Sequence, residues 1–265
     1  MNAFEIRNLE CAYADGQTVL DVSHLDISFG KIIVFLGPSG VGKSTLLETL
    51  GLMNYTIKSG LVKFAFSLDD FKQLWSGQQN ISDIRNAHMS FIFQENNLLE
   101  NISAIENAMI PLLIQGKTDQ EAREIIYQWC KDLDLSFIDE YTKVTELSVG
   151  QKQRLAFIRA ASPDFTVLFG DEPTGNLDEK NGGVLMEALQ QKIYSNKEKM
   201  LSIIVSHDID LAIRYADQIV MLTKHATRKG EIKPTHVYTK NQSIWLSVDR
   251  DFNDMELRNI ISELL

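Results

Sequence analysis

Hydrophobic and polar residues alternate in four stretches of the first 66 residues. The stretches are residues 4–9, 19–22, 25–29 and 61–66, and their period of two predicts β-strands. Because one face of each strand is polar, the pattern favours short antiparallel strands with one face toward solvent. The sequence therefore predicts an N-terminal antiparallel β subdomain.

Continuous apolar runs predict a second kind of strand. Residues 31–36, 165–169 and 201–205 are apolar almost throughout, as is typical of strands buried on both faces of a parallel sheet. Residues 89–93 and 219–222 are further strands of this series. Segments with helical spacing separate these runs, so the predicted fold class is α/β with a mostly parallel core sheet.

Helical periodicity begins at Ala104. Apolar residues recur at helical spacing in residues 104–112 and again in residues 119–133, which predicts two amphipathic helices. A third helix is expected over residues 179–194, and some helix within residues 67–86. The first two helices form a predicted helical subdomain, about residues 96–140, inserted into a domain that spans residues 1–224.

A glycine-rich stretch connects the apolar run at residues 31–36 to a helix-forming segment at residues 46–50. It reads Gly-Pro-Ser-Gly-Val-Gly-Lys-Ser-Thr, with the flanks and spacing of a phosphate-binding loop. Its glycines allow several backbone N–H groups to converge on one anion, and the helix start adds its positive dipole end. Lys43 would reach the β- and γ-phosphates, and Ser44 would hold Mg²⁺. An ordinary strand-to-helix turn that contains a lysine would not account for the complete spacing. The predicted nucleotide-binding residues are Gly37, Pro38, Ser39, Gly40, Val41, Gly42, Lys43, Ser44 and Thr45.

Polar residues follow two of the core strands at the point where each strand ends. Asp171 and Glu172 come after the run at 165–169, and His207 follows the run at 201–205. The carboxyl ends of parallel strands are where open α/β sheets bind ligands. Asp171 is placed to hold Mg²⁺, Glu172 to orient or deprotonate an attacking water, and His207 to bond the γ-phosphate or that water. Beside a phosphate-binding loop, this interpretation is favoured over a solvated acidic turn and a surface histidine.

Ser148 and Gln151 form a capping-box pattern that opens a helix over residues 152–161. Gly150 lies in the first turn of this helix, where glycine is a poor helix former and is explained by a close approach of the backbone to a ligand. A capped helix start is a second anion site. Since one chain cannot easily wrap this site and Lys43 around the same γ-phosphate, we expect two chains to share it.

Composition limits the kinds of partner and site that the sequence can be expected to have. The 26 basic and 36 acidic residues leave a formal charge of −10, which argues against a broad nucleic-acid surface. Cys11 and Cys130 are far apart in sequence, and their spacing predicts neither a disulfide framework nor a zinc site. No apolar run approaches the roughly 20 residues that cross a bilayer. We therefore expect a cytoplasmic protein whose membrane work depends on a partner.

Together the motifs resemble those of an ABC-transporter ATPase subunit. The resemblance covers residues 3 to about 224, with six motifs in the same order. They are residues 37–45, Gln94, residues 147–151, residues 169–172, residues 175–178 and His207. Residues 171–178, with residues 106–113 upstream, are similar to the branch that handles lipoprotein release, macrolide or peptide export, and a cell-division relative.

The resemblance implies a homodimer that buries two ATP molecules at its interface. One subunit would supply Lys43, Ser44, Gln94, Asp171, Glu172 and His207, and the other Ser148, Gly150 and Gln151. Mg²⁺ would be held by Ser44, Gln94 and Asp171. Tyr13 matches the aromatic residue that stacks on adenine, with a surface tyrosine as the alternative, and Asp178 matches the residue that communicates across the dimer. The helical subdomain would contact an integral-membrane permease, which places the protein on the inner face of the cell membrane.

Two features depart from the family pattern. Val149 stands where a glycine is common; as the first helical residue it has ordinary angles, so we expect it to be tolerated with weaker or slower dimer closure. Residues 225–265 form a C-terminal extension with strand-like segments at 236–239 and 244–248 and a helical stripe at 257–264. Packing of this extension against the core is the default expectation, with a regulatory appendage and a dimer contact as alternatives.

The expected function is therefore ATP hydrolysis that drives a membrane transport or extrusion complex through dimer closure. The alternative is a nucleotide-driven assembly switch on a membrane protein that transports nothing, which shares the same motifs. A DNA-repair or ribosome factor of the same family would carry coiled-coil insertions, duplicated ATPase units or basic arms, and the sequence has none of them.

Overall fold

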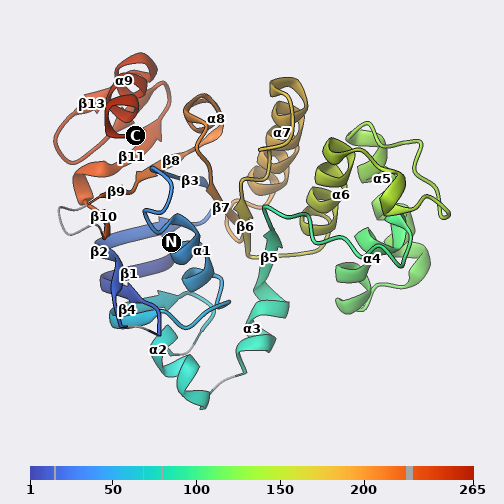
Figure 1. Ribbon diagram of the computed structural model, residues 1–265, viewed down its shortest axis with the longest axis horizontal. Coiled ribbons are helices and arrows are strands. Elements are labelled where there is room, and N and C mark those ends of the chain that lie inside the picture. The colour runs from blue at the N-terminus through green and yellow to red at the C-terminus, as the bar shows by residue number, and fades with distance from the viewer. Residues whose placement is uncertain (15, 68, 79, 225–228) are drawn as a thin grey trace.

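Two β-sheets and the helices around them make up the computed structural model, which describes residues 1–14, 16–67, 69–78, 80–224 and 229–265. The first sheet has the order β4 (Ile57–Phe64), β1 (Asn2–Ala12), β2 (Thr18–Ser28), β10 (Gly230–Ile232) and β9 (Thr223–Lys224). The second has the order β13 (Asp251–Phe252), β12 (Ile244–Leu246), β11 (Val237–Asn241), β8 (Gln218–Met221), β3 (Ile32–Leu36), β7 (Leu201–Val205), β6 (Val167–Asp171) and β5 (Met89–Ile92). Figure 1 shows both sheets with the helices beside them.

The first sheet contains the predicted N-terminal antiparallel strands, β1, β2 and β4. Strand β1 pairs antiparallel with both β2 and β4. The sequence predicted two short strands at 19–22 and 25–29, and this was wrong, because they form the single strand β2. Ser23 and His24 do not interrupt the strand, since β1 stays paired across this point, with Leu9 opposite Val22 and Arg7 opposite His24.

The core sheet confirms the α/β prediction. Strands β8, β3, β7, β6 and β5 run parallel to one another, and β3, β7 and β8 are buried along their whole length. The strand expected at 165–169 begins two residues later and extends to Asp171, because the ladder with β7 continues through the pair Asp171–Val205. That extension carries an acidic residue to the end of the sheet.

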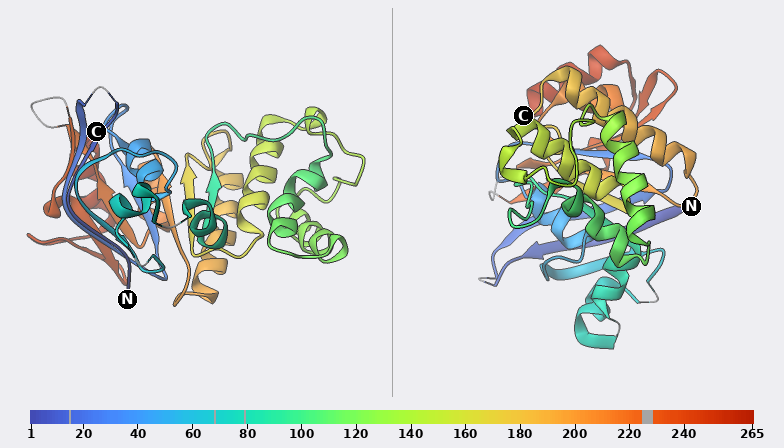
Figure 2. Two further views of the ribbon diagram at one scale, coloured as in Figure 1. Left: turned by 90° about the horizontal axis from the view of Figure 1, so that it is seen from below. Right: turned by 90° about the vertical axis from the view of Figure 1, so that its right-hand side faces the viewer.

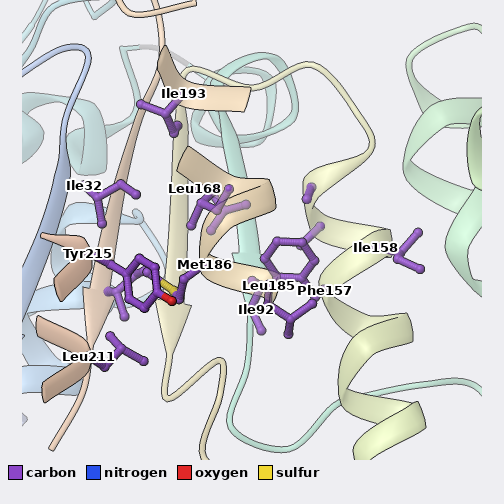
Figure 3. Close-up of a cluster of buried hydrophobic side chains, with 14 of the residues drawn as sticks. Ile32, Ile92, Phe157, Ile158, Leu168, Leu185, Met186, Ile193, Leu211 and Tyr215 are labelled. Carbon is purple, nitrogen blue, oxygen red and sulfur yellow. The ribbon is translucent and has the colours of Figure 1, made fainter. Parts of the chain in front are cut away.

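Helices cover both faces of the core sheet. On one face, Ile32 and Leu168 pack with side chains of α6 (Val149–Ala161), α7 (Glu179–Ser195) and α8 (Ile209–Tyr215), and Figure 3 shows Phe157 and Leu185 within this cluster. On the other face, Phe35 and its neighbours pack against α1 (Lys43–Leu50) and the first sheet. Side chains alternate across the strand, so each face of β3 belongs to a different cluster.

The two predicted helices after Ala104 are α4 (Ala104–Ile114) and α5 (Asp119–Asp132). Each begins with a capping box, at Ser103 and Thr118. Their buried apolar side chains pack with α6. Figures 1 and 2 show α4, α5 and α6 on the side of the core sheet away from the first sheet. The limits of the helical subdomain, about 96–140, stay a prediction. Shorter helices complete the chain: α2 (Phe71–Gln73), η1 (Leu74–Gln78), α3 (Ile81–His88), η2 (Val144–Glu146) and η3 (Pro234–His236).

The C-terminal tail pairs with both sheets. Strand β10 runs parallel to β2 in the first sheet, while β11 pairs antiparallel with β8 and adds β12 and β13 to the core sheet. The expected strand at 236–239 starts one residue later, because residues 234–236 form a helical turn that opens with proline. The final helix α9 (Asp254–Leu264) packs against α8. A domain limit at residue 224 stays a prediction, and the described part of the tail packs against the core.

Among the helices of the described residues, none is long and apolar enough to cross a membrane.

Candidate nucleotide-binding and hydrolysis site

A pocket of about 640 Å³ opens at the carboxyl ends of β3, β6 and β7. The glycine-rich loop after β3 forms one side of it, and Gln94, Asp171, Glu172 and His207 come to it from three other parts of the chain. The predicted loop residues in its lining are Gly37, Pro38, Ser39, Gly40, Gly42, Lys43, Ser44 and Thr45. Val41 does not line the pocket, because its side chain is buried in the core beneath the loop.

Local conformation explains why this loop can hold an anion. Gly42 is the N-cap of α1 with a left-handed φ of 99°, which a residue without Cβ adopts without strain. No side chain caps this helix start, so the first N–H groups of α1 have no side-chain acceptor there. Together with the positive end of the helix dipole, these N–H groups make a site for phosphate.

Lys43 folds back over the loop. Its Nζ donates to the backbone oxygens of Gly37 at 2.6 Å and Pro38 at 3.0 Å. Partial burial lowers the pKa of Lys43, and the negative charges of Glu172 and Asp171 oppose that change. A phosphate group in the pocket would add the anionic partner that this ammonium group lacks in its own loop.

The Ser44 hydroxyl and the Asp171 carboxylate meet at the pocket floor. Ser44 Oγ donates to Asp171 Oδ2 at 3.1 Å. Burial raises the pKa of Asp171, with Glu172 and Glu48 adding to the effect and Ser44 and Lys43 opposing it. Oxygen ligands of this kind suit Mg²⁺, which takes one or two protein carboxylates and completes its shell with phosphates and water. The residues present therefore fit the ion that the family implies.

Glu172 and His207 are paired at the mouth of the pocket. His207 Nδ1 lies 2.9 Å from Glu172 Oε1, and their side chains are 70% and 25% exposed. Glu172 has a φ of 49°, an uncommon conformation for a residue with a side chain, and its N–H donates to the oxygen of Val205. This bond fixes the backbone of Glu172 to the neighbouring core strand, and so positions its carboxylate in the pocket.

Tyr13 lies on the rim of the same pocket. Its hydroxyl is 2.9 Å from Thr45 Oγ1, and 46% of the residue is exposed. Tyr13 is therefore accessible beside the phosphate loop, where a nucleobase could stack on it. The expected stacking on adenine stays a prediction.

Besides Val41, four predicted site residues lie outside this pocket: Ser148, Gly150, Gln151 and Asp178. Ser148 and Gln151 form the predicted capping box, with Ser148 N–H donating to Gln151 Oε1 at 2.8 Å and Gln151 N–H to Ser148 Oγ at 3.3 Å. The helix starts at Val149, three residues before the expected 152, because the capping box already belongs to the first turn. Asp178 caps α7, where it accepts bonds from the backbone and side chain of Asn181. These residues do not reach the nucleotide pocket of their own chain.

Sequence reasoning missed three pocket residues: Val19, Val205 and Leu265. The apolar pattern of β2 and β7 assigned the two valines to the core. Leu265 comes from the tail, and nothing in the sequence connects it to the loop, because the contact depends on how α9 packs against α8. Gln153 was also missed, although a polar residue among the apolar positions of α6 was a possible signal.

The strand–loop–helix and the acidic strand ends define a phosphate-loop nucleoside triphosphatase. Residues 20–175 match the family model described as ABC transporter, so the chain belongs to the ABC transporter family. It is the ATP-binding and ATP-hydrolysing subunit of a transporter.

The chain is similar in sequence to ATP-binding proteins from several bacteria. A lipoprotein-releasing system ATP-binding protein, LolD of Zymomonas mobilis, is 33% identical over 229 residues, which are 83% of this chain and 93% of that protein. The macrolide export ATP-binding/permease protein MacB of Mannheimia succiniciproducens is 34% identical over 80% of this chain and 32% of its own length. A dimeric ATP-binding cassette solved with ADP and phosphate has the same fold, with a TM-score of 0.72 at 24% identity, covering 94% of this chain and 98% of that one.

Proposed function

We propose that two copies of this chain bind two Mg·ATP between them and drive a separate integral-membrane permease. The observation that carries this proposal is the incomplete pocket: Lys43, Ser44, Asp171 and Glu172 line it, and Ser148 of the same chain does not. The first turn of α6 has its N–H groups and the Ser148 hydroxyl at a capped, exposed helix start, which is a site for anions. A second copy would bring that helix start to the γ-phosphate.

In this arrangement each side chain has a defined task. Lys43 and the loop N–H groups bind the β- and γ-phosphates. Ser44 and Asp171, with Gln94, would hold Mg²⁺, which neutralises charge on the phosphate oxygens. Glu172 orients the attacking water and accepts its proton, and His207 holds the Glu172 carboxylate at the mouth of the pocket.

The membrane partner would contact the helical subdomain. Apolar side chains are exposed on and beside α4 and α5, and two of them, Ile114 and Tyr141, are 67% and 78% exposed. Ile114 is the last residue of α4 and Tyr141 lies beside its first turn, so the two are candidate contacts at the two ends of this helix. The chain would thereby be cytoplasmic and peripheral, held on the inner face of the cell membrane by its permease, without nucleic acid as a partner.

The shared site is tested with Ser148→Arg, which places a long cation at the helix start. In gel filtration with Mg·ATP, the Glu172→Gln protein should elute as a dimer, and Glu172→Gln/Ser148→Arg as a monomer that still binds ATP. Normal ATP hydrolysis by the Ser148→Arg single variant would show that the second copy does not complete the site.

The assembly-switch alternative needs a different experiment, because it uses the same motifs. Co-purification with the membrane partner, followed by reconstitution in vesicles, would show ATP-dependent movement of a substrate for a transporter. A partner complex that changes shape with ATP and moves no substrate would support the alternative.

A further inference from the structure

Gln153 lies in the interior of α6, and both its amide nitrogen and its amide oxygen form hydrogen bonds. Only 1% of the residue is exposed. Its Nε2 donates to the backbone oxygens of Glu172 at 3.2 Å and Pro173 at 2.7 Å, and its Oε1 accepts from the N–H of Asn176 at 3.1 Å. All three bonds go to the turn that follows β6, so the side chain connects one helix to one turn.

That turn carries Glu172 in its left-handed conformation. It closes on itself through the bond from Gly175 N–H to the Glu172 oxygen at 3.1 Å, and Val205 of β7 accepts from the Glu172 N–H. Strand β7 therefore holds one side of the turn and Gln153 the other. Without Gln153, the Pro173 oxygen and the Asn176 N–H would lose this partner, and the Glu172 oxygen would keep only the bond from Gly175. The uncommon φ of Glu172 would then lose support.

Gly150 brings the first turn of α6 against the same segment. A Cβ at this position would lie 3.3 Å from Leu177 Cδ2 and 3.9 Å from the Asn176 oxygen. The sequence interpretation assigned this glycine to a close approach to a ligand, and the close approach within the chain is to the turn. Hydrogen bonds from Gln153 and packing at Gly150 thus join α6 to the residues after Glu172 at two points.

We infer that Gln153 is a positioning residue for hydrolysis: it fixes the Glu172 turn to the helix that starts at Ser148. The inference rests on the proposed function, in which Glu172 acts on the ATP of its own subunit and Ser148 completes the ATP site of the partner. Gln153 is buried and does not line the pocket, so it is not placed to contact a nucleotide bound there. It acts through Glu172, and it makes the Glu172 turn and the start of α6 at Ser148 move together.

The test is Gln153→Met, which keeps the length of the side chain and removes its hydrogen bonds. Gln218→Met is the matched control, because Gln218 is also buried but bonds Thr239 of β11, far from the turn in the fold. We expect kcat for ATP hydrolysis to fall at least tenfold in Gln153→Met, with the Kd for ATP within twofold of wild type. The control should keep its kcat. Gln153→Glu, which retains the acceptor for Asn176 and loses both donated bonds at neutral pH, should lower kcat in the same direction and serves if the methionine variant does not fold.

Hydrogen exchange separates this inference from the proposed function. In the nucleotide-free protein, peptides over residues 172–178 should exchange faster in Gln153→Met, while peptides over residues 37–45 should not change. A wild-type chain without ATPase activity would refute the proposed function, and the exchange result would still decide whether Gln153 holds the turn. Unchanged exchange with a kcat within twofold of wild type would overturn the inference, and so would a parallel loss of kcat and ATP affinity in Gln153→Met, which indicates a general structural role.

Discussion

The Glu172→Gln variant isolates the proposed base. Glutamine has the same shape and keeps an oxygen that accepts the bond from His207, whose Nδ1 lies 2.9 Å from the carboxylate. The change therefore removes the basic oxygen and the negative charge, and leaves the turn in place. Because the bond from Gln153 goes to the backbone oxygen of Glu172, it is not affected.

Two magnitudes decide what the variant should show. A general base contributes about 10²–10⁴ to the rate, or roughly 2.7–5.5 kcal/mol at about 1.36 kcal/mol for each factor of ten. A hydrogen bond contributes about 0.5–1.5 kcal/mol to stability, and the His207 side chain is 70% exposed, so its effect lies at the low end. The loss of kcat should therefore far exceed any loss of stability. ATP should bind as well or better, since a negative charge beside the phosphates is gone.

The assay is steady-state phosphate release with a parallel measurement of ATP affinity and of the ATP-bound dimer by gel filtration. Glu48→Gln is the control, because the negative charge of Glu48, like that of Glu172, raises the pKa of Asp171, but Glu48 does not line the pocket. It should retain a kcat within about threefold of wild type. A Glu172→Gln kcat within tenfold of wild type would refute the role of base, and a parallel loss of ATP affinity would assign Glu172 to binding.

Three further predictions concern stability and the departures from the family pattern. Because burial raises the pKa of Asp171 above its ordinary 3.8, the folded protein holds this proton more tightly, and the group destabilises the fold as pH rises through that range. Nucleotide-free Asp171→Asn should then melt at or above wild type at pH 7 by differential scanning fluorimetry, with a difference that shrinks toward acid pH, while Mg·ATP hydrolysis is lost; a lower Tm at pH 7 would contradict this. Trp245→Ala removes a fully buried ring whose Nε1 donates to Asp254, which costs about 3–5 kcal/mol, so Tm should fall about 5–9 °C in a single transition at about 2.1 cal/mol/K per residue over 265 residues; a separate early transition would show a tail that melts alone. Val149→Gly changes a 61% exposed first helical residue, so kcat should stay within about threefold, and a much lower activity would show that valine is needed there.

Local sequence was sufficient for the parts of the site that short-range bonds create. The loop at 37–45 follows from a strand, three glycines and a helix start in direct succession, and Ser148 and Gln151 bond each other within one turn. Apolar runs identified the core strands, because burial on both faces leaves no room for alternation. These features depend on neighbours within a few residues, which a sequence displays.

Contacts between distant residues were decided by the tertiary structure. His207 meets Glu172 because β6 and β7 are adjacent and parallel, and β2 remains one strand because β1 pairs along it. The tail joins the core sheet through the pairing of β11 with β8. Which strands become neighbours depends on packing of the whole chain, so a polar run or a strand end does not by itself determine its partner.

The sequence by itself predicted a triphosphate on a glycine-rich loop and determined where the acidic residues stand along the chain. Only the tertiary structure decided that Gln153, with no mark in the sequence beyond its polarity, bonds three backbone groups of the Glu172 turn. The reason is physical: a loop conformation is set by adjacent residues, whereas a buried amide finds its partners only when helix and strand have packed.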